Sequence, residues 1–105
     1  MFCDIQELDN EILIKFIYDD KSYISGTIYL IYNELYINYF HVDIKNRGNG
    51  IGTNLLNQII NHSKNNYDIK TVHLVDESER YKLSNNIYIK YGFNYIDGKK
   101  MLYNI

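Results

Sequence analysis

The stretch from Phe40 to Thr53, FHVDIKNRGNGIGT, decides how this 105-residue chain folds. It starts with residues typical of a strand, contains three glycines between positions 48 and 52, and continues into an amphipathic pattern. Glycine has no Cβ, so the backbone at these positions can approach a bound group closely. Backbone N–H groups at the start of a helix point outward and favour an anion. The stretch therefore predicts a strand, a phosphate-binding turn and a helix in succession.

The spacing of the glycines distinguishes between kinds of phosphate site. The order G-x-G-x-G, followed by Thr53 and Asn54, has neither the lysine of a P-loop nor the spacing of the dinucleotide fingerprint. It resembles the acetyl-coenzyme A (acetyl-CoA) loop of the GCN5-related N-acetyltransferase (GNAT) superfamily, [QR]-x-x-G-x-[GA], which Arg47, Gly50 and Gly52 match. A purely structural turn and a nucleotide-binding domain are the two alternatives at this point.

A second stretch supports the same resemblance. Residues 87–93, IYIKYGF, are similar to the helix end fYek-x-GF that forms the family's second signature, and they follow one further strand as the family requires. The resemblance covers about residues 11–105, and the two motifs together imply the GNAT fold, an α+β arrangement with a mixed sheet. They also imply that two parallel strands splay apart to admit the cofactor.

The hydrophobic pattern predicts one domain over residues 1–105, with residues 1–10 a short strand or a loose arm. Alternating apolar residues predict three strands joined by short turns, which form an antiparallel meander. The β-α-β crossover that follows should make the third and fourth strands parallel. The predicted strands are residues 11–18, 23–32, 35–44, 71–75, 93–96 and 101–104, the last two a hairpin around Asp97-Gly98. The predicted helices are residues 51–64, ended near Asn65-Asn66, and a second that begins near Ser78, with Glu79 in its first turn and Leu83, Ile87 and Tyr91 on one face.

The resemblance also implies which residues hold acetyl-CoA. Backbone groups of Phe40 and Val42 would meet the pantetheine arm. Backbone N–H groups of the loop would hold the diphosphate. The loop residues implied are Arg47, Gly48, Asn49, Gly50, Ile51, Gly52 and Thr53.

Acetyl transfer to an amine requires a neutral amine, and a lysine-like amine is neutral at roughly one part in two thousand at pH 7. Deprotonation therefore costs about 4.6 kcal/mol, part of which a base can supply. Tyr88 matches the family tyrosine that often protonates the departing thiolate; a packing role is its alternative. Glu34 is the candidate base, on a strand face that Tyr36, Asn38, Phe40 and Val42 are predicted to share. His41 should point to the opposite face.

Other polar residues carry weaker signals. Asp76, Glu77 and Glu79 follow a predicted strand and could attract a cationic acceptor, or could simply be solvated. Cys3 is expected to be an ordinary thiol, and the spacing of the three histidines suggests no metal site.

Composition excludes several classes of function. Residues 1–44 hold eight acidic and two basic side chains, whereas residues 45–105 hold nine basic and five acidic ones. This asymmetry suits an anionic cofactor and a cationic acceptor. Two arginines and no basic cluster argue against nucleic acid. The sequence has no apolar run that predicts a signal peptide or a membrane span, and its single cysteine fits a reducing, intracellular (cytoplasmic) compartment.

The sequence therefore predicts an acetyl-CoA-dependent N-acetyltransferase that acts directly on a primary amine, in a small molecule or at a protein lysine or N-terminus. The alternative is a weak or inactive GNAT module that binds coenzyme A (CoA) or a protein partner. The family usually has a strand and two helices before the meander, where this chain has about ten residues. We therefore expect an open acceptor side, which a second copy could complete as a homodimer.

Overall fold

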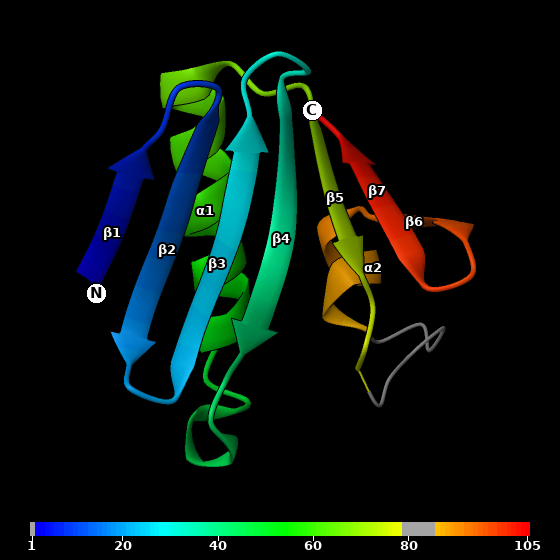
Figure 1. Cartoon of the computed structure of the whole chain (residues 1–105). Coiled ribbons are helices and arrows are strands. Elements are labelled where there is room, and N and C mark those ends of the chain that lie inside the picture. Colours follow the sequence, from blue (N-terminus) through cyan, green and yellow to red (C-terminus); the bar gives the residue numbers. More distant parts are fainter. Residues whose placement is uncertain (1, 79–85) are drawn as a thin grey trace.

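Four antiparallel strands form one part of a mixed sheet in the computed structural model, which describes residues 2–78 and 86–105 (Figure 1). Each strand pairs with the next along the chain, as the predicted meander requires. The four strands are β1 (Phe2–Glu7), β2 (Glu11–Asp19), β3 (Ser22–Tyr29) and β4 (Glu34–His41). β1 and β2 are joined by a turn at residues 8–10, without the two helices that the family usually has there.

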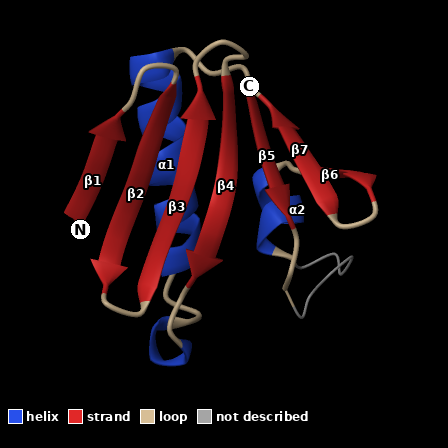
Figure 2. Cartoon of the chain, viewed as in Figure 1, coloured by secondary structure: helices blue, strands red, loops and turns tan. Residues whose placement is uncertain are grey.

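A second group of strands continues the sheet in the order β1-β2-β3-β4-β5-β7-β6 within the described residues. β5 (Thr71–Val75) is parallel to β4, and β7 (Lys100–Asn104) pairs antiparallel with both β5 and β6 (Asn94–Asp97). Helices α1 (Ile51–Tyr67) and α2 (Ile87–Tyr91) lie on the same side of the sheet, and the 3-10 turn η1 (Ile44–Asn46) precedes α1 (Figure 2). The α+β fold with a parallel crossover is confirmed.

The core lies between α1 and the strands in front of it. Period-2 alternation on the strands and i, i+4 spacing on α1 direct their apolar side chains toward each other. The buried core residues of β2 are Ile12, Ile14 and Phe16, and those of α1 are Leu55, Leu56, Ile59 and Ile60. This packing fixes the first turn of α1 against the end of β4.

Helix α1 ends at Tyr67, and the predicted end at Asn65-Asn66 is wrong. The side chain of Asn66 donates a hydrogen bond to the carbonyl of His62, within the last turns of the helix. The chain leaves the helix at Asp68, which has a left-handed φ of 52°. Aspartate and asparagine tolerate this conformation better than most residues do.

Helix α2 begins at Ile87, not near Ser78. Asn86 has extended backbone angles and its side chain accepts a hydrogen bond from the Tyr88 N–H, so it caps the helix instead of continuing it. Gly92, with φ of 124°, ends the helix as predicted. The predicted helical positions Glu79 and Leu83 lie outside the described residues.

A β-bulge in β4 overturns the predicted sharing of one strand face. Ser25 pairs with Tyr39 and Gly26 pairs with Ile37, so Asn38 is an extra residue on β4. The extra residue shifts the alternation by one position. Phe40 consequently faces the helices, together with Leu35, rather than the opposite side of the sheet with Tyr36.

Candidate functional site

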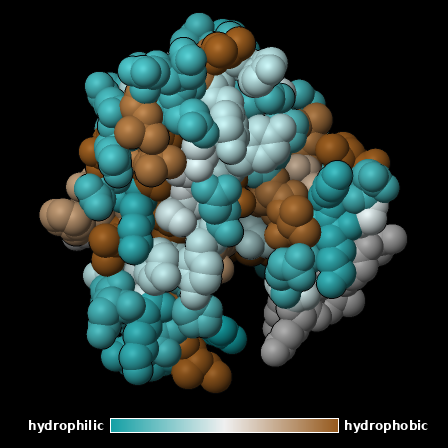
Figure 3. Space-filling model, viewed as in Figure 1, coloured by the Kyte–Doolittle hydropathy of each residue, from teal (hydrophilic) through white to brown (hydrophobic). Residues whose placement is uncertain are grey.

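β4 and β5 separate soon after they meet. Their parallel pairing consists of Glu34 with Thr71, Leu35 with Val72 and Tyr36 with His73. Beyond Tyr36, β4 continues to His41 without a pairing to β5. A notch opens between the two parts of the molecule at the lower edge of the space-filling view, below the point where these strands diverge in Figure 1 (Figure 3).

The glycine-rich loop lies at the open end of this gap. Gly48 and Gly50 have φ angles of 83° and 77°, and a Cβ added at either would meet no atom within 4 Å. Gly50 is the N-cap of α1, and no side chain caps the helix or places an acid in its first turn. The first N–H groups of a helix have no partner within it. The loop therefore presents free backbone donors at the positive end of a 17-residue helix.

Gly52 has a different role from its two neighbours. A Cβ there would lie 3.1 Å from Cδ1 of Ile87 and 3.5 Å from side-chain atoms of both Phe40 and Val42. Its missing side chain lets the first turn of α1 pack against the end of β4 and against α2. The predicted cofactor residues Phe40, Val42 and Gly52 are thus brought together.

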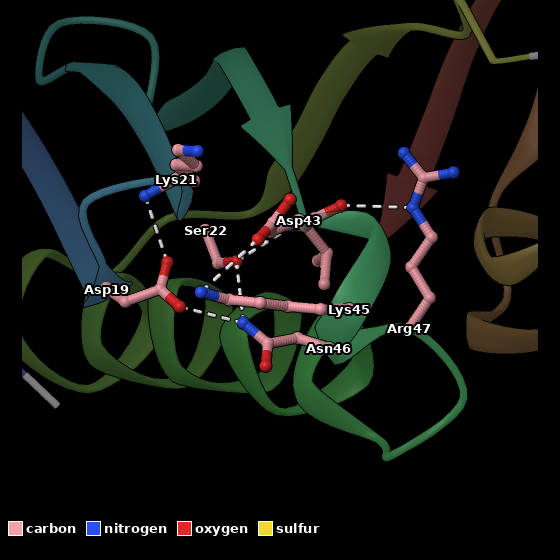
Figure 4. A network of polar contacts seen from close by, with 8 residues as sticks. Asp19, Lys21, Ser22, Asp43, Lys45, Asn46 and Arg47 are labelled. Atoms are coloured by element: carbon pink, nitrogen blue, oxygen red, sulfur yellow. Dashed lines mark hydrogen bonds and ion pairs between the residues drawn. The ribbon is translucent and has the colours of Figure 1, made fainter.

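A network of polar contacts joins the segment before the loop to the β2–β3 turn (Figure 4). The side-chain amide of Asn46 donates to Asp19 at 2.7 Å, and the backbone N–H of Asp43 donates to the Ser22 hydroxyl at 2.8 Å. Partial desolvation acts to raise the pKa of Asp19, but hydrogen bonds from Lys21, Asn46 and Ser22 outweigh it and hold that pKa below its usual value. The meander thereby positions the loop.

Arg47 extends away from this network toward the gap (Figure 4). Its Nε donates to the backbone carbonyl of Val42 at 3.0 Å. This bond ties the Arg47 side chain to the segment that follows β4.

Tyr88 lies on α2 and is buried in the core. Its ring centroid is 6.0 Å from that of Phe40 across the gap and 6.1 Å from that of Phe93. Burial raises the pKa of the Tyr88 phenol well above its ordinary value, and the negative charge of Asp76 adds to this shift. The hydroxyl therefore stays protonated at neutral pH, which excludes a role as a base, and the raised pKa also makes the phenol a weaker proton donor than an ordinary tyrosine.

Asp76 is fully buried, which does not support the predicted attraction of an acceptor by this carboxylate. It accepts hydrogen bonds from the Ser78 hydroxyl, from the Tyr95 hydroxyl and from the side-chain amide of Asn86 at 2.8 Å. Burial acts to raise the pKa of Asp76, but these hydrogen bonds outweigh it and lower that pKa. Asp76 thereby anchors the residue that caps α2. Glu77 is exposed, 3.8 Å from Lys99, and Glu79 lies outside the described residues.

Glu34 lies at the closed end of the gap, in a cluster that sequence analysis missed. Its Oε2 is 2.9 Å from Nε2 of His73, which is 3.1 Å from the hydroxyl of Thr71. The His73 ring stacks on Tyr36, with centroids 4.4 Å apart. No sequence spacing connects residues 34 and 73, because only the parallel register of β4 and β5 brings them together. His41 is exposed.

Comparison with known proteins identifies the family. The model of the acetyltransferase (GNAT) domain matches residues 4–102, so the chain belongs to the GNAT acetyltransferase family. No curated protein matches the chain.

Solved structures show the same fold at low sequence identity. An acetyltransferase described as putative, from Agrobacterium tumefaciens, superposes with a TM-score of 0.74 at 16% identity, over 91% of this chain and 77% of that one. An acetyltransferase from Bacillus cereus gives 0.67 at 19% identity, over 88% and 69%. The PaiA N-acetyltransferase of Thermoplasma acidophilum, solved with coenzyme A, gives 0.66 at 18% identity, over 90% and 60%.

The described residues contain neither a metal centre nor a membrane helix. No group of three or more His, Cys, Asp or Glu side chains there could hold a metal ion. No helix in this part of the chain is long and apolar enough to cross a membrane.

Proposed function

We propose that the protein transfers the acetyl group of acetyl-CoA directly to a primary amine. The observation that carries this proposal is the gap between β4 and β5, which opens onto the glycine-rich start of α1. The diphosphate of the cofactor would bind N–H groups of residues 48–53, because the N–H of Arg47 already donates to the carbonyl of Ile44. The pantetheine arm would lie along β4, past Val42 and Phe40.

The length of the gap supports this placement. From Val42 to Tyr36 the chain spans six residues, which is at most about 20 Å because β4 contains the bulge at Asn38. An extended pantetheine arm has a comparable length. A diphosphate on the loop therefore puts the thioester along β4 between Phe40, which Tyr88 contacts, and the closed end, where Tyr36 and His73 form the last parallel pair.

The position of Tyr88 suits the departure of CoA. When the amine nitrogen attacks the carbonyl carbon, the C–S bond breaks and its electron pair stays on sulfur. Tyr88, which contacts Phe40 beside the proposed arm, would give its proton to this thiolate. Solvent would then reprotonate the phenolate.

Direct transfer agrees with the position of the single cysteine. Cys3 lies on β1, at the edge of the sheet away from β5. Partial desolvation and the charge of Asp4 raise the pKa of the thiol of Cys3, which disfavours the reactive thiolate.

The acceptor belongs to a class that structural neighbours illustrate. One is a spermidine N-acetyltransferase of Vibrio cholerae, and another is a ribosomal-protein-S18-alanine N-acetyltransferase of Escherichia coli. These are properties of those proteins, and they define the panel to test: a polyamine, a peptide with a free N-terminal alanine and a lysine peptide.

A second candidate is a module that binds CoA without transferring acetyl. The short β1–β2 turn favours it, because the helices that usually help to form the acceptor site are replaced by residues 8–10. A homodimer is the corresponding proposal for an active protein, with a second copy that completes the acceptor site. Light scattering that gives a monomer at high concentration would count against the homodimer.

Calorimetric titration with acetyl-CoA, beside CoA and ATP, tests the proposed cofactor. We expect micromolar binding of acetyl-CoA and no binding of ATP. The amine panel then distinguishes enzyme from module. Turnover with any amine supports the transferase, whereas binding without turnover across the panel supports the module.

A further inference from the structure

The cluster at the closed end of the gap has a defined hydrogen-bond pattern. An ionised carboxylate is only an acceptor, so at the 2.9 Å contact Nε2 of His73 carries the hydrogen and Glu34 accepts it. Thr71 accepts from the same nitrogen, and its hydroxyl is within 3.5 Å of Glu34. In neutral His73 the lone pair is consequently on Nδ1.

Nδ1 of His73 is partly accessible to solvent. It makes no hydrogen bond to another described residue. The one buried side-chain nitrogen or oxygen atom without a hydrogen bond in the described part of the chain is Oγ of Ser63. Nδ1 makes no hydrogen bond to a described residue and is not such an atom, so it is not fully buried, and the His73 side chain is 20% exposed.

The cluster faces away from the helices. Leu35 and Val72, which form the pair just before Tyr36 and His73, are fully buried in the core. Successive strand residues alternate faces, so Tyr36 and His73 lie on the opposite face of the sheet. An acceptor could therefore reach the thioester from the side of the sheet that no described helix covers (Figure 2).

We infer that His73 is the general base of the proposed transfer, with Glu34 as the residue that positions it and Tyr36 as the surface on which its ring stacks. This inference rests on the proposed function, and it gives Glu34 a positioning role in place of the base role that the sequence predicts. In this arrangement Glu34 fixes the tautomer and stabilises the imidazolium that forms.

The proton balance is complete without another reactant. The ammonium of the acceptor gives a proton to Nδ1 of His73, and the neutral nitrogen forms the new C–N bond. The attacking nitrogen then loses its second proton to solvent. CoA leaves as the thiolate and takes a proton from Tyr88. His73 returns its proton to solvent, so one proton is released overall.

Few groups surround the ring of His73. Among the described residues, Glu34 is the charged side chain in contact with it. Tyr36 covers its ring, and Leu102 of β7 lies opposite it in register.

His73→Phe is the informative variant, because it keeps a ring to stack on Tyr36 and removes both nitrogens. His41→Phe, at an exposed histidine of β4, is the matched control. The assay measures kcat from pH 7 to pH 9, with spermidine or whichever panel amine gives the fastest turnover. Acetyl-CoA affinity of each variant is measured by calorimetry.

We expect His73→Phe to lower kcat about 100-fold at neutral pH with unchanged affinity for acetyl-CoA. The neutral fraction of the amine rises about tenfold per pH unit below its pKa, so the deficit should shrink as pH rises. Glu34→Gln, which retains an acceptor for Nε2, should lower kcat less than Glu34→Ala at unchanged KM.

The outcomes separate the two proposals. If the wild type transfers acetyl and the deficit of His73→Phe is absent or constant with pH, His73 is not the base and the proposed function stands. If the wild type does not bind acetyl-CoA or acetylates no amine, the proposed function fails and this inference fails with it.

Discussion

The two ends of the β4–β5 gap differ in the groups that they offer. The open end presents backbone donors from the start of α1, with no acid in the first helical turn. The closed end presents side chains, with Glu34 and Thr71 around His73. The difference teaches that one pair of diverging strands can present main-chain donors at one end and a hydrogen-bonded cluster of side chains at the other.

The largest expected effect concerns the anchor of α2, which borders the open end. Asp76→Ala should lower the free energy of unfolding by about 3 kcal/mol at pH 7, because Asn86 and Tyr95 lose their buried acceptor. Urea denaturation measures this loss. Glu77→Ala, at an exposed neighbour, should have little effect.

The same variant has a predicted pH dependence. The pKa of Asp76 is lowered in the folded protein, so its stabilisation is fully present above the unfolded value near 3.9. It is lost as pH falls through the folded value. The stability difference between wild type and Asp76→Ala should therefore shrink below about pH 4, and a difference that grows on acidification would contradict the lowered pKa.

Tyr88→Phe tests whether Tyr88 donates a proton in the chemical step. We expect kcat to fall about 100-fold, or about 2.7 kcal/mol, with unchanged affinity for acetyl-CoA. Tyr91→Phe on the same short helix is the control. If Tyr88→Phe and the wild type have equal kcat, Tyr88 is not the proton donor and has only a packing role.

Gly26→Ala tests the closed end through its packing. A Cβ at Gly26 would lie 2.7 Å from the carbonyl oxygen of Tyr36 and 2.9 Å from Cδ1 of Leu35, beside the bulge in β4. Because the backbone must shift, we expect the free energy of unfolding, measured by urea denaturation, to fall by about 2 kcal/mol. If this variant is as stable as the wild type, the strands do not approach so closely.

The smallest effect is expected at the open end. Gly50→Val places a branched side chain at a φ of 77° and among the free N–H groups of the loop. Acetyl-CoA affinity should fall about tenfold, or about 1.4 kcal/mol. Gly98→Val, at a φ of 56° in the β6–β7 turn, imposes similar backbone strain far from the loop. Equal affinity losses in the two variants would mean that the loop does not bind the cofactor.

Local patterns in the sequence predicted most elements of the fold and the position of the glycine-rich loop. Period-2 and helical spacings gave the strands and α1, and the glycine motif predicted where the free N–H groups lie. Strict alternation of inward and outward side chains along β4 does not predict the bulge at Asn38. The spacing of three between the apolar residues Ile37 and Phe40 is the sequence signal of this bulge. The contact between His73 and Glu34 depends on the pairing of β4 with β5, which are neighbours in the sheet but far apart in the sequence. No local spacing in the sequence encodes this contact.

The divergence of β4 from β5 also gives the sheet an edge in its interior. Among the described residues, positions 37–41 of β4 have a strand neighbour on one side only. Open edges recruit strands from other chains, and proteins commonly shield them. A ligand with its own amide groups, such as pantetheine, can hydrogen-bond to this edge and prevent a strand of another polypeptide from pairing with it. The protein without CoA should therefore be more prone than the CoA-bound form to self-association through strand addition, because the bound cofactor would cover the open edge.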